Sequence, residues 1–101
     1  ELKRAVELFS DKPGPHMSLG WWYERRGRLE EARSTYEAGR WAAMRAQDFF
    51  SEAFLDNNLA MVEARLGRKD EAVKLLRRCL YLVPKHPRAA ANLKRLEPMA
   101  Q

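Results

Sequence analysis

The chain has 101 residues, a length sufficient for one small domain with a modest core, and its formal net charge is +5. Its 46% hydrophobic and 33% charged residues and single cysteine exclude a disordered polyampholyte and a disulfide-stapled mini-protein. No uncharged run approaches the roughly 18 apolar residues of a membrane span, so membrane insertion is not expected. The lone cysteine is compatible with a reducing compartment, and we favour the cytoplasm without assigning a location. The chain begins with Glu1 and is expected to be a piece of a longer protein.

Turn residues divide the chain into helical segments. Glycine and proline gather at Pro13-Gly14-Pro15, at Gly27, at Gly67 and around Pro84 and Pro87. The segments between these breaks are rich in Ala, Leu, Glu, Arg and Lys, which favour helix. Isoleucine is absent and no stretch alternates apolar and polar residues with period two. The sequence therefore predicts an all-α domain.

Two of these segments repeat each other at a spacing of 40 residues. Residues 19–36 read Leu-Gly-x-x-Tyr-x-x-x-Gly-x-x-x-x-Ala-x-x-x-Tyr, and residues 59–76 read Leu-Ala-x-x-Glu-x-x-x-Gly-x-x-x-x-Ala-x-x-x-Leu. Each copy predicts a helix, a turn at the central glycine and a second helix packed antiparallel to the first. The small residues let the two helix backbones approach closely. This internal repeat predicts a solenoid built of helix pairs.

The repeat resembles the tetratricopeptide repeat, a 34-residue helix–turn–helix unit, most clearly from Asn58 to Pro84. The resemblance implies an all-α solenoid, a right-handed superhelix of antiparallel helix pairs, over nearly the whole chain. Residues 1–12 would be the second helix of a truncated unit, 13–46 unit one, 47–52 an insertion, 53–86 unit two, and 87–101 a half unit or capping helix.

The chain departs from the family pattern in its middle. The step between units is 40 rather than 34 residues, and Met44 stands where a closing proline is expected. The six extra residues either lengthen the second helix of unit one, which we favour, with a turn near Gln47-Asp48, or follow a short turn after which Asp48 or Ser51 caps a new helix. Asp56 and Glu63 replace aromatic residues usual in the family, so this helix is expected to be more polar than the norm.

The segment Gly14-Pro15-His16-Met17 allows two interpretations. It reads like a remnant of a protease site and cloning site, which would make residues 1–13 foreign. The apolar spacing of Leu2, Ala5 and Leu8 favours a native helix instead.

No catalytic constellation can be assembled from the sequence. His16 and His86 lie 70 residues apart in predicted turns, and Cys79 falls on the inner face of a helix. No Cys/His cluster with zinc spacing and no phosphate-binding loop occurs. We expect neither an enzyme nor a cofactor or metal site.

Binding is the remaining function class. In the tetratricopeptide repeat family, the first helices of successive units line a concave groove that receives an extended peptide or a partner helix. Adjacent residues on a helix point about 100° apart, so Trp21 and Trp22 cannot share one environment. The resemblance implies that Trp22 packs on the preceding helix and that Trp21 faces the groove. Asn58 and Arg88 also match positions of a carboxylate clamp known in the family, but Met17 and Trp21 occupy other clamp positions, so chaperone-tail binding is not expected. The resemblance places the following residues on the concave face: Met17, Trp21, Glu24, Arg25, Asn57, Asn58, Met61, Arg65, Arg88, Asn92 and Arg95.

The predicted function is thus a non-catalytic scaffold or adaptor module with a protein or peptide partner. Two alternatives remain open. Residues 21–37 are also similar to half-a-tetratricopeptide repeats of RNA-processing complexes, which would imply contact with RNA or ribonucleoprotein. Self-association through the end helices is the other alternative. Two surfaces outside the groove are further candidates, although core packing and solvated helix faces explain them more simply: the aromatic set Trp41, Phe49, Phe50 and Phe54, and the basic set Lys74, Arg77 and Arg78.

Overall fold

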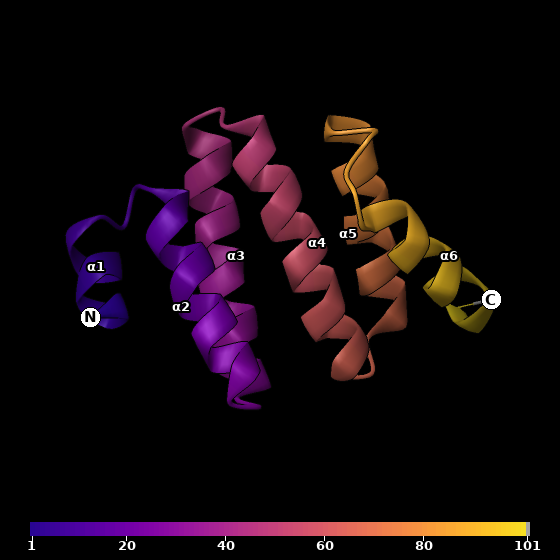
Figure 1. Cartoon of the computed structure of the whole chain (residues 1–101), viewed down its shortest axis with the longest axis horizontal. Helices are drawn as coiled ribbons and strands as arrows, with labels where there is room; N and C mark the ends of the chain where they lie inside the picture. The colour runs from indigo at the N-terminus through magenta and orange to yellow at the C-terminus, as the bar shows by residue number, and fades with distance from the viewer. Residues whose placement is uncertain (101) are drawn as a thin grey trace.

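Antiparallel helix hairpins stand side by side in chain order in the computed structural model, which describes residues 1–100, with side chains as far as Glu97 (Figure 1). Its extents are 41 × 29 × 18 Å. Each helix packs on the next along the chain, and α2 also touches α4. The predicted all-α helical-repeat fold is confirmed, and none of the described helices is long and apolar enough to cross a membrane. The helices are α1 (Leu2–Leu8), α2 (Pro13–Arg25), α3 (Leu29–Arg45), α4 (Phe49–Arg65), α5 (Lys69–Leu82) and α6 (Ala89–Ala100).

The two hairpins α2–α3 and α4–α5 turn in the same way. Gly27 has a φ of 73° and Gly67 a φ of 86°, a left-handed conformation that a side chain disfavours. The amide that follows each glycine donates back across the turn, from Arg28 to the Tyr23 carbonyl at 3.0 Å and from Arg68 to the Glu63 carbonyl at 2.8 Å. The glycine turns lie where the sequence predicts them.

The turn between the hairpins has the same hydrogen-bond pattern, with the Asp48 amide donating to the Ala43 carbonyl at 2.9 Å, but it contains no glycine. Gln47 takes the positive φ of 56°, and the Asp48 carboxylate caps α4 by accepting from the Ser51 amide at 3.1 Å. Residues 49–52 therefore form the first turn of α4 rather than an extension of α3, which corrects that part of the path that we favoured. The turn itself lies at Gln47 and Asp48, as expected. α3 nevertheless ends at Arg45, three residues past the position equivalent to the end of α5. The six extra residues between the units thus lengthen both α3 and α4.

Small residues bring the paired helices close together. A Cβ at Gly20 would lie 2.4 Å from a ring carbon of Tyr36, which is fully buried between α2 and α3. A Cβ at Gly39 would lie 2.6 Å from the Cβ of His16, whose buried ring donates from Nδ1 to the Lys12 carbonyl at 2.9 Å. His16 is therefore part of the packing of α2 on α3, so the segment from Gly14 to Met17 has a structural role in this fold.

Candidate binding face

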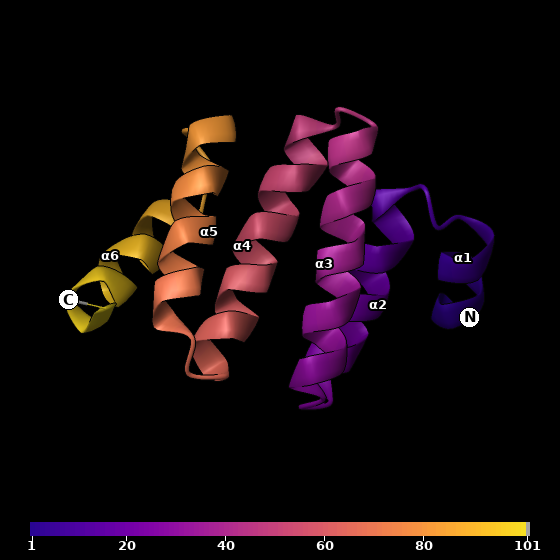
Figure 2. The same ribbon diagram turned by 180° about the vertical axis from the view of Figure 1, so that it is seen from behind.

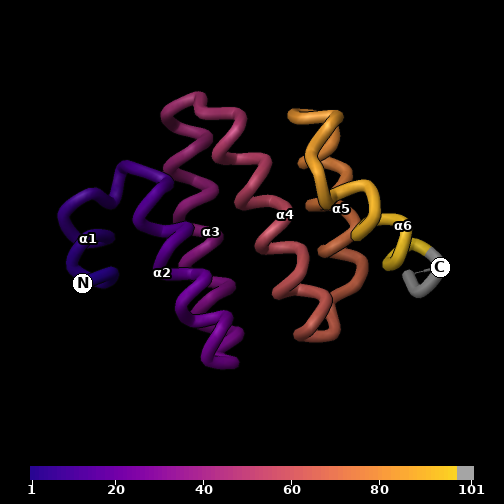
Figure 3. Tube along the Cα trace, viewed as in Figure 1, coloured from indigo at the N-terminus to yellow at the C-terminus, as the bar shows by residue number. Residues whose placement is uncertain are grey.

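The helices α2, α4 and α6 form one face of the molecule, which we call the α2–α4–α6 face. α2 lies in front of α3 in Figure 1, and the view from behind in Figure 2 brings α3 and α5 forward. The same course of the chain is traced in Figure 3. Two hollows open on this face, one between α2 and α4 and one between α4 and α6.

The first hollow, named here the apolar hollow, has a volume of about 430 Å³. Trp21 contributes a ring that is 55% exposed, with the Arg25 guanidinium 4.9 Å from its centroid. This stacking holds the ring at the surface while leaving it open to a ligand. The lining residues are Leu2, Met17, Ser18, Trp21, Trp22 and Asn58.

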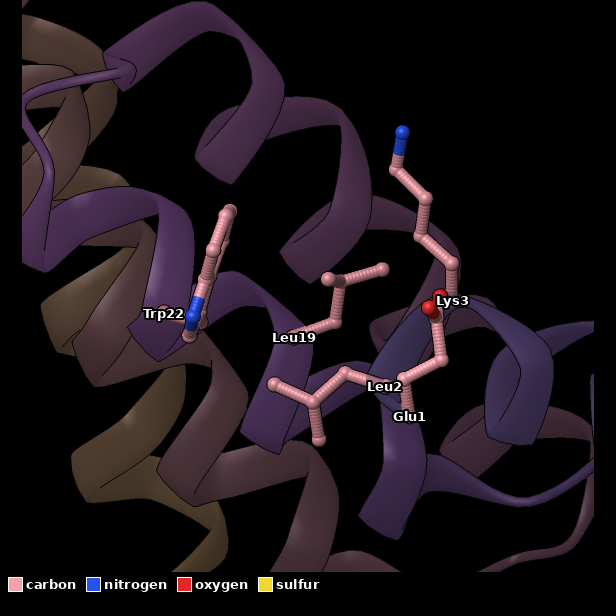
Figure 4. A pocket seen from close by; sticks show the side chains of 5 residues that line it. All are labelled: Glu1, Leu2, Lys3, Leu19 and Trp22. Atoms are coloured by element: carbon pink, nitrogen blue, oxygen red, sulfur yellow. The ribbon is translucent and has the colours of Figure 1, made fainter.

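Trp22 occupies a different environment from its neighbour. It is half-buried and meets the Tyr23 ring edge-on, with the centroids 5.5 Å apart. Figure 4 shows it with Leu2 and Leu19 around a separate hollow of about 390 Å³ between α1 and α2. Trp22 thus packs at the contact with α1 while also lining the apolar hollow, and Trp21 lies on the open face.

The second hollow, named here the basic hollow, has a volume of about 350 Å³. Its floor is apolar, and three cationic side chains stand around it, one each from α4, α5 and α6. It is lined by Met61, Ala64, Arg65, Lys69, Asn92, Arg95 and Leu96.

Buried amides lie beside the basic hollow. Asn92 donates from Nδ2 to Oδ1 of Asn57 at 3.0 Å, and its own Oδ1 accepts from Arg95 at 3.0 Å. Asn57 is 5% and Asn92 7% exposed, so each amide needs a partner within the protein. This chain of hydrogen bonds links α4 to α6 and orients the Arg95 guanidinium.

Glu24 links the packed core to the basic hollow. Its Oε1 accepts from the buried Tyr36 hydroxyl at 2.9 Å, and its Oε2 lies 3.8 Å from the Arg65 guanidinium. Burial, with a smaller effect from Glu24, raises the pKa of the Tyr36 hydroxyl, so this hydroxyl remains a donor. Glu24 is therefore held between the packed core and the open face.

The concave-face residues expected from the sequence differ in where the structure places them. Met17, Trp21 and Asn58 line the apolar hollow, while Met61, Arg65, Asn92 and Arg95 line the basic hollow. Glu24 and Arg25 contact residues of these hollows, and Asn57 lies buried beneath. Arg88 lines neither hollow; it is exposed just before α6, and its backbone amide donates to His86 Nδ1 at 3.2 Å. Sequence reasoning missed Leu2, Ser18, Trp22, Ala64, Lys69 and Leu96 as lining residues.

His86 and Cys79, whose side chains could in principle take part in catalysis, serve the packing of the helices instead. His86 accepts at Nδ1 from the amides of Arg88 and Ala89, both at 3.2 Å, and its ring lies 4.5 Å from that of Phe54. Cys79 is fully buried, and burial raises the pKa of its thiol to about 11, which disfavours the reactive thiolate. Within residues 1–97, no group of three metal-binding side chains comes together.

On the opposite face, formed by α3 and α5, several arginines form ion pairs with carboxylates. Buried carboxylates on α4 meet arginines of the neighbouring helices: Glu52 meets Arg78 at 2.9 Å, and the fully buried Asp56 meets Arg40. Burial raises the pKa of Asp56 to about 6, and Arg40 opposes part of that rise. The polar residues expected in α4 thus link this helix to α3 and α5.

The two candidate surfaces outside the groove also have defined environments. In the basic set, Lys74 pairs with Glu71 at 3.6 Å, Arg77 with Glu97, and Arg78 with Glu52. In the aromatic set, Phe54 is half-buried, whereas three rings are exposed, namely Trp41, Phe49 and Phe50.

Comparisons with known proteins agree with this architecture. Two family models, both described as tetratricopeptide repeat, match the chain at residues 16–41 and at residues 57–82. Each match contains one glycine turn of a hairpin, Gly27 in the first and Gly67 in the second. The comparison with curated proteins finds no match.

Proposed function

We propose, since this chain belongs to the tetratricopeptide repeat family, that it is a scaffold or adaptor module that binds a partner peptide or helix on its α2–α4–α6 face. Repeats of this family are generally protein–protein interaction modules. The observation that carries the assignment to this face is the apolar hollow, where the exposed Trp21 ring lies next to Met17 and Asn58.

The chemistry of the apolar hollow suits a polypeptide. Trp21 and Met17 offer apolar surface to a side chain, and the Asn58 amide is able both to donate to and to accept from a peptide backbone. A hollow of about 430 Å³ is large enough for one bulky side chain of a partner. We therefore expect an apolar or aromatic residue of the partner to bind there.

A catalytic role has little support. Members of this family are typically non-catalytic. The buried Cys79 thiol has a raised pKa, and His86 uses its ring nitrogen to hold the start of α6. We propose that the chain acts by binding alone.

A pull-down from nuclease-treated lysate of the source cells tests the proposal. The wild-type chain is compared with the Trp21→Ala/Asn58→Ala double variant, with Trp41→Ala as a matched variant that removes an exposed tryptophan from α3. Circular dichroism verifies that all three are folded. A protein retained by the wild type and by Trp41→Ala, but lost from the double variant, supports the proposal; equal retention by all three refutes the groove assignment. In a parallel pull-down from untreated lysate, a protein that is retained there but lost after nuclease treatment favours the RNA alternative.

A further inference from the structure

The basic hollow collects positive charge that the protein does not neutralise. Neither Lys69 nor Arg95 forms an ion pair with any carboxylate in the described part of the chain. Arg65 has only the 3.8 Å approach to Glu24. On the opposite face the arginines Arg40 and Arg78 are matched with buried carboxylates, whereas Lys69 and Arg95 are not.

The hydrogen bonds beneath the basic hollow hold one of its cations in place. The Asn57–Asn92 bond fixes the Asn92 amide, whose oxygen then accepts from Arg95. Because both amides are buried, reversing Asn92 would break both bonds at once and leave polar atoms unpaired. The Arg95 guanidinium is thus oriented before any ligand arrives, which lowers the entropy cost of binding.

We propose that the basic hollow binds a carboxylate side chain, Asp or Glu, of the peptide whose apolar residue occupies the apolar hollow; this inference rests on the proposed function. Arg65, Lys69 and Arg95 supply donors for the carboxylate oxygens. Met61, Ala64 and Leu96 form an apolar floor that suits the methylene groups of such a side chain. The partner is therefore acidic at this point.

The position of the two hollows on α4 sets the spacing in the peptide. Asn58 in the apolar hollow and Arg65 in the basic hollow are seven residues apart on this helix, or about 10 Å along its axis. The hollows flank α4, and packed helices lie about 8–10 Å apart, so their centres are about 10–15 Å from each other. An extended chain covers that distance in about three to five residues.

Features of the basic hollow favour a peptide over a nucleic acid. A strand of RNA requires a basic track for successive phosphates and aromatic rings on which bases stack. The basic hollow has three cations and no aromatic lining residue, and the Trp21 ring is already covered on one face by Arg25. A single carboxylate matches this site better than a polyanion.

Selection from a displayed library of random 12-residue peptides tests the inference on the folded chain. We expect enriched peptides to carry Trp, Phe, Leu or Met with Asp or Glu about three to five residues away. The most enriched peptide is then synthesised together with its amide analogue, Asp→Asn or Glu→Gln. Affinities for both are measured against the wild type and against Arg95→Gln, Lys69→Gln and the matched control Lys94→Gln, an exposed lysine on α6 outside the basic hollow.

The inference predicts that Arg95→Gln weakens the acidic peptide about tenfold and leaves the amide analogue unchanged, with a smaller loss for Lys69→Gln and none for Lys94→Gln. Peptides that depend on Trp21 but show no acidic residue, or that bind Arg95→Gln equally well, overturn this inference and leave the proposed function standing. Failure to enrich any peptide that Trp21→Ala rejects overturns both. Binding of poly(U) RNA that Arg95→Gln abolishes overturns the carboxylate assignment.

Discussion

Replacing Gly20 by alanine tests the closest approach between α2 and α3. A Cβ at this position would lie 2.4, 2.5 and 2.9 Å from three ring carbons of Tyr36, whereas carbon atoms in ordinary contact are about 3.5–4.0 Å apart. The Tyr36 ring has no room to move away, because it is fully buried and its hydroxyl is bonded to Glu24. The added methyl group must therefore push the two helices apart.

The expected destabilisation combines two opposing effects. Overpacking a core costs about 1–3 kcal/mol, and the depth of this overlap favours the upper part of that range. Alanine within a helix regains up to about 1 kcal/mol relative to glycine. We expect a net loss of about 2 kcal/mol for Gly20→Ala, which lowers the melting temperature of a domain this size by about 8–16 °C.

Gly14 provides the matched control within the same helix. A Cβ there meets nothing within 4 Å, so Gly14→Ala lacks the overlap and should melt close to the wild-type temperature. Thermal unfolding followed by far-ultraviolet circular dichroism, with urea unfolding as a second measure, compares the three proteins. If Gly20→Ala is as stable as Gly14→Ala, the close packing of α2 against Tyr36 is refuted.

Three further predictions concern buried or capping side chains. The pKa of Asp56 is raised by burial to about 6 from 3.8, so the folded state binds a proton between pH 4 and 6 that the unfolded chain releases, and its stability falls as the pH rises through that window. Between pH 4 and pH 7, the free energy of unfolding measured with urea should fall by up to about 3 kcal/mol more for the wild type than for Asp56→Asn. An equal change in both proteins would contradict the assignment. Burial lowers the pKa of His86 below 6.5, so its contribution has the opposite sign: stability is lost as the pH falls below 6.5, and the His86→Phe variant should lose less. A midpoint for His86 above 6.5 in an NMR titration would refute this. Asp48→Ala removes the cap of α4 and should cost about 1 kcal/mol by urea unfolding, whereas Asp48→Asn should retain most of it; equal losses would exclude capping by the side chain.

Local chemistry explains which parts of the fold were predictable. Gly27 and Gly67 mark the two hairpin turns because glycine tolerates the left-handed conformation there. The third turn lacks that signal, since Gln47 adopts the positive φ, and only the capping potential of Asp48 indicated where α4 begins. Charged residues inside α4 gave a correct expectation of polarity, but their arginine partners lie on other helices and have no local signature.

The candidate site depends more on tertiary packing. Helical register separates Trp21 from Trp22 without further information. The pairing of Asn57 with Asn92 joins residues 35 positions apart, so the sequence alone suggests two free amides where the structure has a buried hydrogen bond. Lys69 reaches the basic hollow from the start of a second helix of a hairpin, whereas the resemblance assigns only first helices to the groove.

The most direct test of the α2–α4–α6 face as the binding surface is NMR chemical-shift mapping of the isotope-labelled chain with the selected peptide. The account predicts that the largest amide shifts fall around Ser18, Trp21, Asn58, Met61 and Arg95, along both hollows. Shifts concentrated instead at Trp41, Phe49 and Phe50, with the two hollows unchanged, would contradict it.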